Sequence, residues 1–302
     1  MQWSQIKTIF ILCFLVLNIY LALQFFDKRE QTDVSILERH ESTLEDQLEA
    51  ENITYGDLPE EDLEESFISV VQKTFSDEEI SMLNKLKNQK STTVINKNLI
   101  ISQYDKPIGF SSDQSNKEIE EYVKGTFIYP EEYEFWNWNK ELNVLIFFQK
   151  KMDRPVYFNQ NGLVLVFLDK NDELKFYVQT MLGDASTRRD RQSLIQPIKA
   201  IETLYDNNEL YSGDDIGPVE IGFHTRVPLA NGVQVFVPTW KVTVNKEKSY
   251  FVNAMEGFIF SSDEVGFLKE AIENIVDKVQ SLEDEDMLRE NILSFLETKL
   301  EE

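Results

Sequence analysis

The feature that most constrains this chain is a long apolar segment at its start, residues 6–26. Its one charged side chain, Lys7, lies at the beginning, and Asn18 is the strongly polar residue of its interior. A helix rises about 1.5 Å per residue, so this segment spans roughly 30 Å, which matches the hydrocarbon core of a bilayer. It is longer than the apolar part of a typical signal peptide and lacks a small-x-small cleavage site. We therefore expect residues 1–26 to form a cytoplasmic tip and an uncleaved, single-pass transmembrane helix.

The charges beside this segment do not decide its orientation, because Lys7 lies on one side and Lys28 and Arg29 lie on the other. The residues before the segment form a tip short enough to remain in the cytoplasm. No later run of the sequence approaches spanning length, so the whole tail lies on one side of the membrane. We expect a cytoplasmic N-terminus and an extracytoplasmic C-terminal domain.

The tail is strongly acidic. The protein has 302 residues with 54 acidic and 30 basic side chains, and its net charge is −24. Phosphate binding requires a basic surface, so this composition argues against a nucleic-acid partner. Solubility is the simplest explanation of the charge. The single cysteine, Cys13, lies in the apolar segment, so the tail contains no disulfide.

Apolar spacing predicts helices at both ends of the tail. Residues 27–65 are predicted to form a helical stalk followed by an acidic linker. Residues 263–302 are predicted to form C-terminal helices with apolar side chains at three-four spacing. Such a stripe most often packs on its own sheet, and a partner-binding helix is the alternative.

Pairs of serine and glutamate three residues apart predict where helices begin. The serine hydroxyl accepts a hydrogen bond from the third backbone N–H, and the carboxylate accepts one from the backbone N–H of the serine. The predicted pairs are Ser76 with Glu79, Ser115 with Glu118, and Ser261 with Glu264.

Two segments between these ends resemble one another. Residues 66–185 and 186–262 each read as a helix followed by an antiparallel meander. Residues 175–183 (KFYVQTMLG) and 249–257 (SYFVNAMEG) occupy corresponding positions. We predict an α+β fold in which a helix-plus-sheet unit occurs twice. The alternative is that aromatic strands ending in a glycine turn look alike.

The residue types used in common catalytic and metal sites are scarce in the tail. It has no cysteine, and its two histidines are His40 and His224. A zinc site would need carboxylates for nearly all its ligands, which zinc rarely accepts. A Ser-His-Asp arrangement would have to use His224, whose neighbours are typical of an ordinary strand. We therefore predict no enzyme, no catalytic residues and no cofactor.

Two acidic stretches contain residue types that could bind a cation. Residues 169–173 resemble the start of a calcium loop, but Leu174 replaces the glycine and Thr180 replaces the final glutamate. This pattern predicts a hairpin instead. Residues 206–209, near Asp214 and Asp215, are a weaker cation candidate. We predict no metal site.

Asn18 is the more informative polar residue. In hydrocarbon an amide prefers a hydrogen-bonding partner, and such a bond between helices contributes roughly 1 kcal/mol. We predict that Asn18 marks a face that contacts another transmembrane helix, with a tolerated asparagine as the alternative. The predicted partner-binding face consists of Ile11, Phe14, Leu15, Asn18, Leu21, Ala22 and Phe25.

The chain contains WSQIKTIF at residues 3–10, NIT at 52–54 with LP at 58–59, the helix 197–205, PTWKV at 238–242 and YFVNA at 250–254. Together these segments resemble the YycI (WalI) family. The resemblance implies a non-catalytic, single-pass membrane protein of Gram-positive bacteria. It implies that the protein adjusts the sensor histidine kinase YycG (WalK), which controls cell-wall metabolism, together with a second regulator, YycH. It also implies that the regulators contact the kinase through their transmembrane helices.

Two other functions remain open at this point. The strands that end at residues 251–254 also resemble PepSY-type domains. The alternative is therefore an extracytoplasmic binding module on a passive anchor, which inhibits a peptidase or binds a wall polymer. A carboxylate-dependent wall hydrolase is the third hypothesis, and it requires two paired acids in a cleft.

Overall fold

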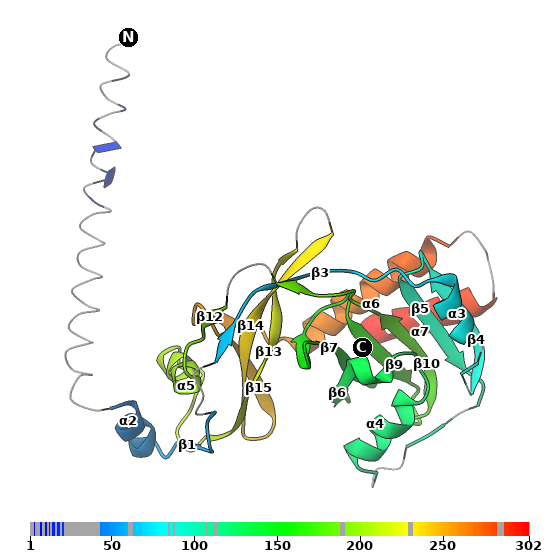
Figure 1. Ribbon diagram of the computed structural model, residues 1–302, viewed down its shortest axis with the longest axis horizontal. Helices are drawn as coiled ribbons and strands as arrows, with labels where there is room; N and C mark the ends of the chain where they lie inside the picture. Colours follow the sequence, from blue (N-terminus) through cyan, green and yellow to red (C-terminus); the bar gives the residue numbers. More distant parts are fainter. Residues whose placement is uncertain are drawn as a thin grey trace. The chain divides into compact units, whose positions relative to one another are not determined.

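The protein has a mixed α+β fold with a large sheet (Figure 1). The computed structural model describes residues 43–59, 63–83, 85–86, 88–106, 108–110, 114–187, 191–228, 232–282 and 287–301, and nine residues among the first 20. The chain divides into two compact units. The smaller one comprises Met1–Tyr55 and Leu210–Asp215, and the larger one comprises Gly56–Glu209 and Ile216–Glu302.

The smaller unit contains helix α2 (Leu44–Ala50) and the short strand β1 (Thr54–Tyr55). Thr43 has an extended backbone and caps α2: its hydroxyl accepts a hydrogen bond from the N–H of Asp46, and the Asp46 carboxylate accepts one from the N–H of Thr43. A single helix therefore does not run through Thr43. Residues 27–42 of the predicted stalk lie outside the described residues, and the limits 27–65 stay a prediction.

The nine described residues of the first 20 are helical, and their side chains are exposed. Within the described part of the chain, no helix combines the length and the apolar character needed to cross a membrane. Most of the predicted spanning segment, residues 6–26, lies outside that part.

Apart from β2 and β12, the strands of the larger unit belong to one sheet. Along its main path β13 and β8 pair in parallel, and the other pairs are antiparallel. Its main path is β11-β3-β14-β13-β8-β7-β9-β10-β5-β4; β6 pairs with β7, and β15 pairs with β14 and β16. The bounds are β3 (Ile68–Val71), β4 (Gln89–Ile95), β5 (Leu99–Tyr104), β6 (Tyr133–Asn139), β7 (Val144–Lys151), β8 (Arg154–Tyr157), β9 (Leu163–Leu168), β10 (Leu174–Thr180), β11 (Ser186–Thr187), β13 (Asp215–Pro228), β14 (Val233–Val244), β15 (Lys248–Asn253) and β16 (Ile259–Phe260). A separate pair joins β2 (Glu64–Glu65) and β12 (Gln192–Ser193).

Two pairings join distant parts of the sequence. β3 pairs with β14, so that Ile68 lies opposite Phe236, and β8 lies parallel to β13. At the second pairing a Cβ on residue 222 would collide with the ring of Tyr157, so Gly222 permits the close approach. Strands from the predicted segments 66–185 and 186–262 thus share one sheet. The division into two similar units stays a prediction.

Helices cover both faces of the part of the sheet that contains β4, β5, β7, β9 and β10 (Figure 1). α6 (Glu264–Gln280) and α7 (Met287–Glu301) pack on one face, and α3 (Asp77–Leu83) and α4 (Asn116–Lys124) pack on the other. β9 shows why both faces are apolar: Leu163, Leu165 and Phe167 point to the first face, and the residues between them point to the second. The remaining helices are the 3₁₀ turn η1 (Pro130–Glu132) and α5 (Pro197–Asp206), which packs against β14.

Two of the three predicted capping boxes are confirmed. Glu79 accepts from the N–H of Ser76 at 2.7 Å and donates its own N–H to the Ser76 hydroxyl at 3.2 Å. Ser115 and Glu118 form the same pair at the start of α4. The predicted Ser261–Glu264 box is wrong. Asp263 caps α6 by accepting from the N–H of Gly266, because it directly precedes the first helical residue, Glu264, whereas Ser261 lies two residues farther from the helix.

The C-terminal stripe and the acidic hairpin are also confirmed. Buried residues of α6 and α7, including Leu268, Ile272 and Leu296, pack on their own sheet, as the simpler interpretation expected. The Asp169 carboxylate accepts from the N–H groups of Asn171 and Glu173, so residues 169–173 form the β9–β10 turn.

Candidate functional site

The structure describes three of the seven residues of the predicted transmembrane face. Phe14 and Leu15 are helical and 56% and 52% exposed, and Asn18 is helical and exposed as well. Ile11, Leu21, Ala22 and Phe25 lie outside the described residues. The partner-binding role of this face stays a prediction.

His224, the histidine that a catalytic triad would require, lies among aromatic rings. Its ring stacks on Phe260 with centroids 4.1 Å apart and also contacts Phe158 and Phe251. Nδ1 lies 3.2 Å from the carbonyl of Thr225, and burial lowers the pKa of His224. Its side chain makes no hydrogen bond to a hydroxyl or a carboxylate of the described residues. His40 lies outside the described residues.

Where the structure is described, no group of three or more His, Cys, Asp or Glu side chains is arranged to hold a metal ion. Asp214 and Asp215 instead take part in the loop of the smaller unit. The backbone carbonyl of Asp214 and the carboxylate of Asp215 accept hydrogen bonds from Thr54.

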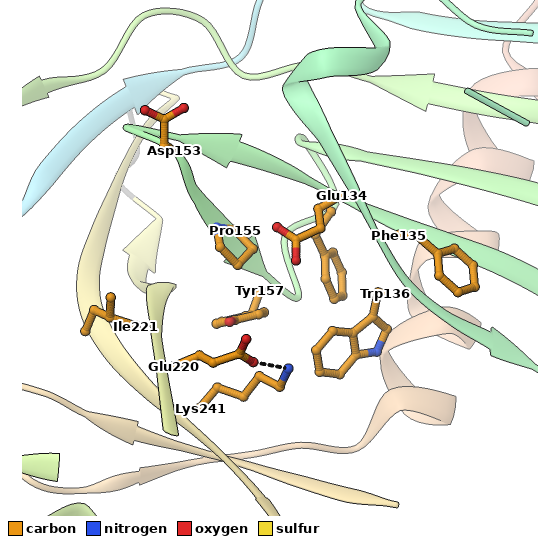
Figure 2. Close-up of a pocket in the computed structure, with 10 residues that line it drawn as sticks. Glu134, Phe135, Trp136, Asp153, Pro155, Tyr157, Glu220, Ile221 and Lys241 are labelled. Atoms are coloured by element: carbon orange, nitrogen blue, oxygen red, sulfur yellow. Dashed lines mark hydrogen bonds and ion pairs between the residues drawn. The ribbon is translucent and has the colours of Figure 1, made fainter. Parts of the chain in front are cut away.

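The larger unit contains a pocket of about 250 Å³ where β6, the β7–β8 turn, β8, β13 and β14 meet (Figure 2). We call it the β6–β14 pocket. It is lined by Glu134, Phe135, Trp136, Phe148, Asp153, Pro155, Tyr157, Glu220, Ile221 and Lys241. None of these residues was a candidate from the sequence, because no motif relates their positions.

One wall of the pocket is held by a carboxylate behind it. The indole N–H of Trp136 donates to Glu264 at 2.8 Å, and the amide of Asn139 donates to the same carboxylate at 2.9 Å. Glu264 is the first residue of α6, so these bonds also hold the start of that helix against β6. The orientation of the Trp136 ring is therefore fixed.

Lys241 has its charge compensated inside the pocket. Its ammonium group lies 2.7 Å from the carboxylate of Glu220, and it stands 5.1 Å from the centre of the Trp136 ring (Figure 2). A cation over an indole face is attracted to its negative quadrupole. Lys241 thus packs between a carboxylate and an aromatic ring.

Tyr157 lies beneath these side chains. It is only 2% exposed, and its ring lies over Gly222. Burial, together with the nearby carboxylates of Glu220 and Glu134, raises the pKa of Tyr157 well above its usual range. The phenol is therefore protonated, and it is a hydrogen-bond donor as well as an acceptor.

A second, wider pocket of about 620 Å³ lies between α7 and the turns of two hairpins. Its lysines and carboxylates alternate. Lys175 pairs with Asp169 at 3.8 Å, and Asp172 accepts from the amide of Asn143. Four lysines and three carboxylates line this pocket, so its charges nearly balance and favour neither a cationic nor an anionic ligand.

The β6–β14 pocket offers binding chemistry. Its lining contains no Ser, Thr, Cys or His, so it holds no nucleophile paired with an imidazole base. It does combine a fixed aromatic wall, a protonated phenol and several carboxylates. Such groups orient a ligand by hydrogen bonds and charge.

Comparison with known proteins gives one decisive result. No curated protein matches the chain. A crystal structure of an uncharacterized protein from Eubacterium rectale is similar at 10% identity, with a TM-score of 0.43, over 70% of this chain and 91% of that chain. The family model described as YycI protein matches residues 31–255, which include every residue of the β6–β14 pocket. Because this match covers most of its length, the chain belongs to the YycI family, a regulatory and non-catalytic family of the YycG/WalK two-component system.

Proposed function

We propose that this protein is a single-pass membrane regulator of a YycG/WalK-like sensor histidine kinase and that it works together with a YycH-like regulator. The observation that carries the proposal is the family match over residues 31–255. The apolar segment at residues 6–26 supports the membrane anchor, because its length suits a bilayer. In this proposal the N-terminus lies in the cytoplasm and the C-terminal domain lies outside the cell membrane.

The anchor is proposed to contact the helices of the kinase. A regulator changes the output of a kinase only if it binds one kinase state more tightly than the other. A hydrogen bond between membrane helices contributes about 1 kcal/mol, which changes an equilibrium about fivefold. A bond from Asn18 that forms in one kinase state alone is therefore enough to produce a measurable shift.

The outer region is proposed to hold the partner regulator. The order of elements supports two similar units: α4 precedes β6, β7, β9 and β10, and α5 precedes β13, β14 and β15. The proposed limits are residues 66–185 and 186–262, with the C-terminal helices at 263–302. The partner-facing surface in this proposal belongs to the outer region, while the kinase-facing surface belongs to the anchor.

Replacing Asn18 with Leu in the full chain tests the anchor. The expected result is a several-fold change in a transcriptional reporter of the kinase, with an unchanged amount of protein in the membrane fraction. Leu17→Ala is the matched control, because Leu17 is helical and exposed but lies off the predicted face. A reporter that responds equally to both substitutions, or to neither, would contradict a role for this face.

A PepSY-like binding module on a passive anchor is the second candidate. The β6–β14 pocket favours it, because a ligand site in the outer region requires no contact within the membrane. Exchanging residues 1–26 for an unrelated membrane helix separates the two functions. Loss of kinase regulation supports the leading proposal, and full retention supports the passive anchor.

A further inference from the structure

The β6–β14 pocket is lined by a tyrosine whose hydroxyl the described part of the fold leaves without an internal hydrogen bond. The Tyr157 side chain is almost completely buried, yet its hydroxyl makes no hydrogen bond to any described residue. The hydroxyl oxygen is not among the fully enclosed side-chain atoms that lack a partner, so it is open to the pocket. Gly222 gives the Tyr157 ring its space, and the ring is among the side chains that line the pocket. The hydroxyl is therefore placed where a ligand can complete its hydrogen bonding.

The charges around this hydroxyl are unequal. Three carboxylates, from Glu134, Asp153 and Glu220, line the pocket with one ammonium group, that of Lys241. Glu220 is paired with Lys241, whereas Glu134 and Asp153 form no ion pair with any residue that the structure describes. In Figure 2 Glu134 and Glu220 approach Tyr157 from two sides, and Asp153 lies toward one end of the pocket. The excess of negative charge selects a cation.

The size of the pocket limits the ligand further. About 250 Å³ lies below the roughly 300–1,000 Å³ typical of pockets for drug-sized molecules, and it suits one long side chain or a small amine. Trp136 supplies an apolar wall whose orientation is fixed by Glu264. Such a wall contacts the methylene stem of a ligand while the carboxylates contact its charged end.

We infer that the β6–β14 pocket binds one organic cation, an ammonium or guanidinium group on a short aliphatic stem. The cationic N–H groups donate to Glu134 and to the oxygen of Tyr157, and the stem lies along Trp136. A basic side chain of a peptide and a free amine share this chemistry. The inference goes beyond the proposed function, because it holds whether or not the anchor contacts a kinase.

Calorimetric titration of the full chain in nanodiscs of neutral phosphatidylcholine tests the inference. The probes are agmatine, as the free cation, and the peptide acetyl-Gly-Arg-Gly-amide. Acetyl-Gly-citrulline-Gly-amide is the uncharged control, because citrulline keeps the shape of arginine without its charge. We expect saturable binding of one cation per chain and at least about tenfold weaker binding of the citrulline peptide. Binding of the peptide alone identifies a side chain of a partner as the source, and binding of agmatine identifies a free amine.

Three substitutions locate the binding. Tyr157→Phe removes only the unpaired hydroxyl and keeps the ring, and we expect about tenfold weaker binding at an unchanged melting temperature. Glu134→Gln, at an exposed position, is expected to weaken binding to a similar extent. Glu247→Gln is the matched control, because Glu247 is exposed in the β14–β15 turn and lies outside the pocket. Its affinity should equal that of the original chain.

Several results would overturn the inference. They are the absence of binding by either cation, equal affinity for the arginine and citrulline peptides, and unchanged affinity in both Tyr157→Phe and Glu134→Gln. Tight binding of a neutral sugar such as N-acetylglucosamine without binding of the cations would assign the pocket to a different ligand class and would likewise contradict it.

Discussion

The buried tyrosines on the two faces of the large sheet differ in their access to a pocket. The Tyr177 hydroxyl, on the face covered by α3 and α4, is enclosed without a partner in the described structure, whereas Tyr157, on the other face, lines the β6–β14 pocket. On the face covered by α3 and α4, the Tyr104 hydroxyl lies 2.9 Å from that of Thr126, and the Tyr133 hydroxyl donates to the carbonyl of Thr180 at 2.6 Å. On the face covered by α6 and α7, Tyr157 is equally buried but has no partner for its hydroxyl among the described residues. A paired hydroxyl stabilises the fold, whereas an unpaired one beside a pocket is available to a ligand.

The same faces differ in how their helices are attached. α3 and α4 begin with complete capping boxes, which are made within each helix. α6 uses its first glutamate, Glu264, to bind Trp136, Asn137 and Asn139 of β6. Its start is therefore held by the sheet as well as by its own cap. The comparison teaches that the capping glutamate serves its own helix in α4, whereas in α3 it also accepts from Tyr129 and in α6 it binds β6 and leaves the cap to Asp263.

Truncating an isoleucine on each face gives the largest expected effect. Ile272→Ala in α6 should lower the free energy of unfolding by about 4 kcal/mol, within the range of roughly 2–5 kcal/mol for buried isoleucines. Ile119→Ala in the first turn of α4 should cost about 2 kcal/mol, because surrounding side chains at a helix end relax more easily. Urea denaturation measures both. A greater loss for Ile119→Ala would reverse the ranking of the two faces.

Removing the contact between α6 and β6 gives the second-largest expected loss of stability. Glu264→Ala leaves the indole N–H of Trp136 and the amide of Asn139 without their acceptor, so we expect a loss of about 2 kcal/mol. Glu264→Gln keeps one acceptor oxygen and should lose about half as much. Thermal melting of both variants measures the difference. Equal stability of the Ala variant and the original chain would show that the cap at Asp263 suffices for α6.

Removing one hydroxyl on each face tests the comparison directly. Tyr133→Phe leaves the Thr180 carbonyl without this donor and should cost about 1 kcal/mol. Tyr157→Phe removes a hydroxyl that has no partner in the described structure, so its stability should stay within about 0.5 kcal/mol of the original. The denaturant midpoints of the two variants measure the difference in stability between them. Destabilisation of Tyr157→Phe by as much as Tyr133→Phe would reveal an internal partner for its hydroxyl.

The last prediction concerns the capping glutamates Glu79 and Glu118. Replacing them should change how the stability of the protein depends on pH. Burial alone would raise the pKa of Glu79, but hydrogen bonds from Tyr129 and Ser76 and the Lys73 ammonium at 3.0 Å lower it to about 2. Since the pKa of the folded state lies below the usual 4.5, the carboxylate contributes stability above pH 4.5 and loses it as the pH falls toward 2. Glu79→Gln should remove about 1 kcal/mol of this pH-dependent stability.

Glu118→Gln is the matched variant at the same position of α4. Hydrogen bonds from the backbone and hydroxyl of Ser115 lower the pKa of Glu118, but this side chain is exposed, and no tyrosine or lysine contributes to the shift. The stability difference between pH 7 and pH 3, measured by urea denaturation, should therefore fall more in Glu79→Gln than in Glu118→Gln. The opposite order would mean that Tyr129 and Lys73 do not act on Glu79 in solution.

Much of the fold was predictable because its signals are local. The hairpin at residues 169–173 and the starts of α3 and α4 depend on side chains within four residues of one another. The C-terminal helices follow from an apolar stripe that only a helix places on one face. The Ser261–Glu264 prediction failed because two possible caps, Ser261 and Asp263, compete there, and contacts with β6 occupy the glutamate.

The sequence by itself determined an apolar anchor-length segment, an acidic tail, the family and the capped helices, since each depends on composition or on neighbours in the chain. The tertiary structure alone decided that β3 joins β14, that β8 lies parallel to β13, and that Trp136, Tyr157 and Glu220 meet at one pocket. The physical reason is that alternating apolar residues specify a strand and its buried face but not its partner. Register across the sheet, together with the space left by Gly222, sets which distant side chains come together.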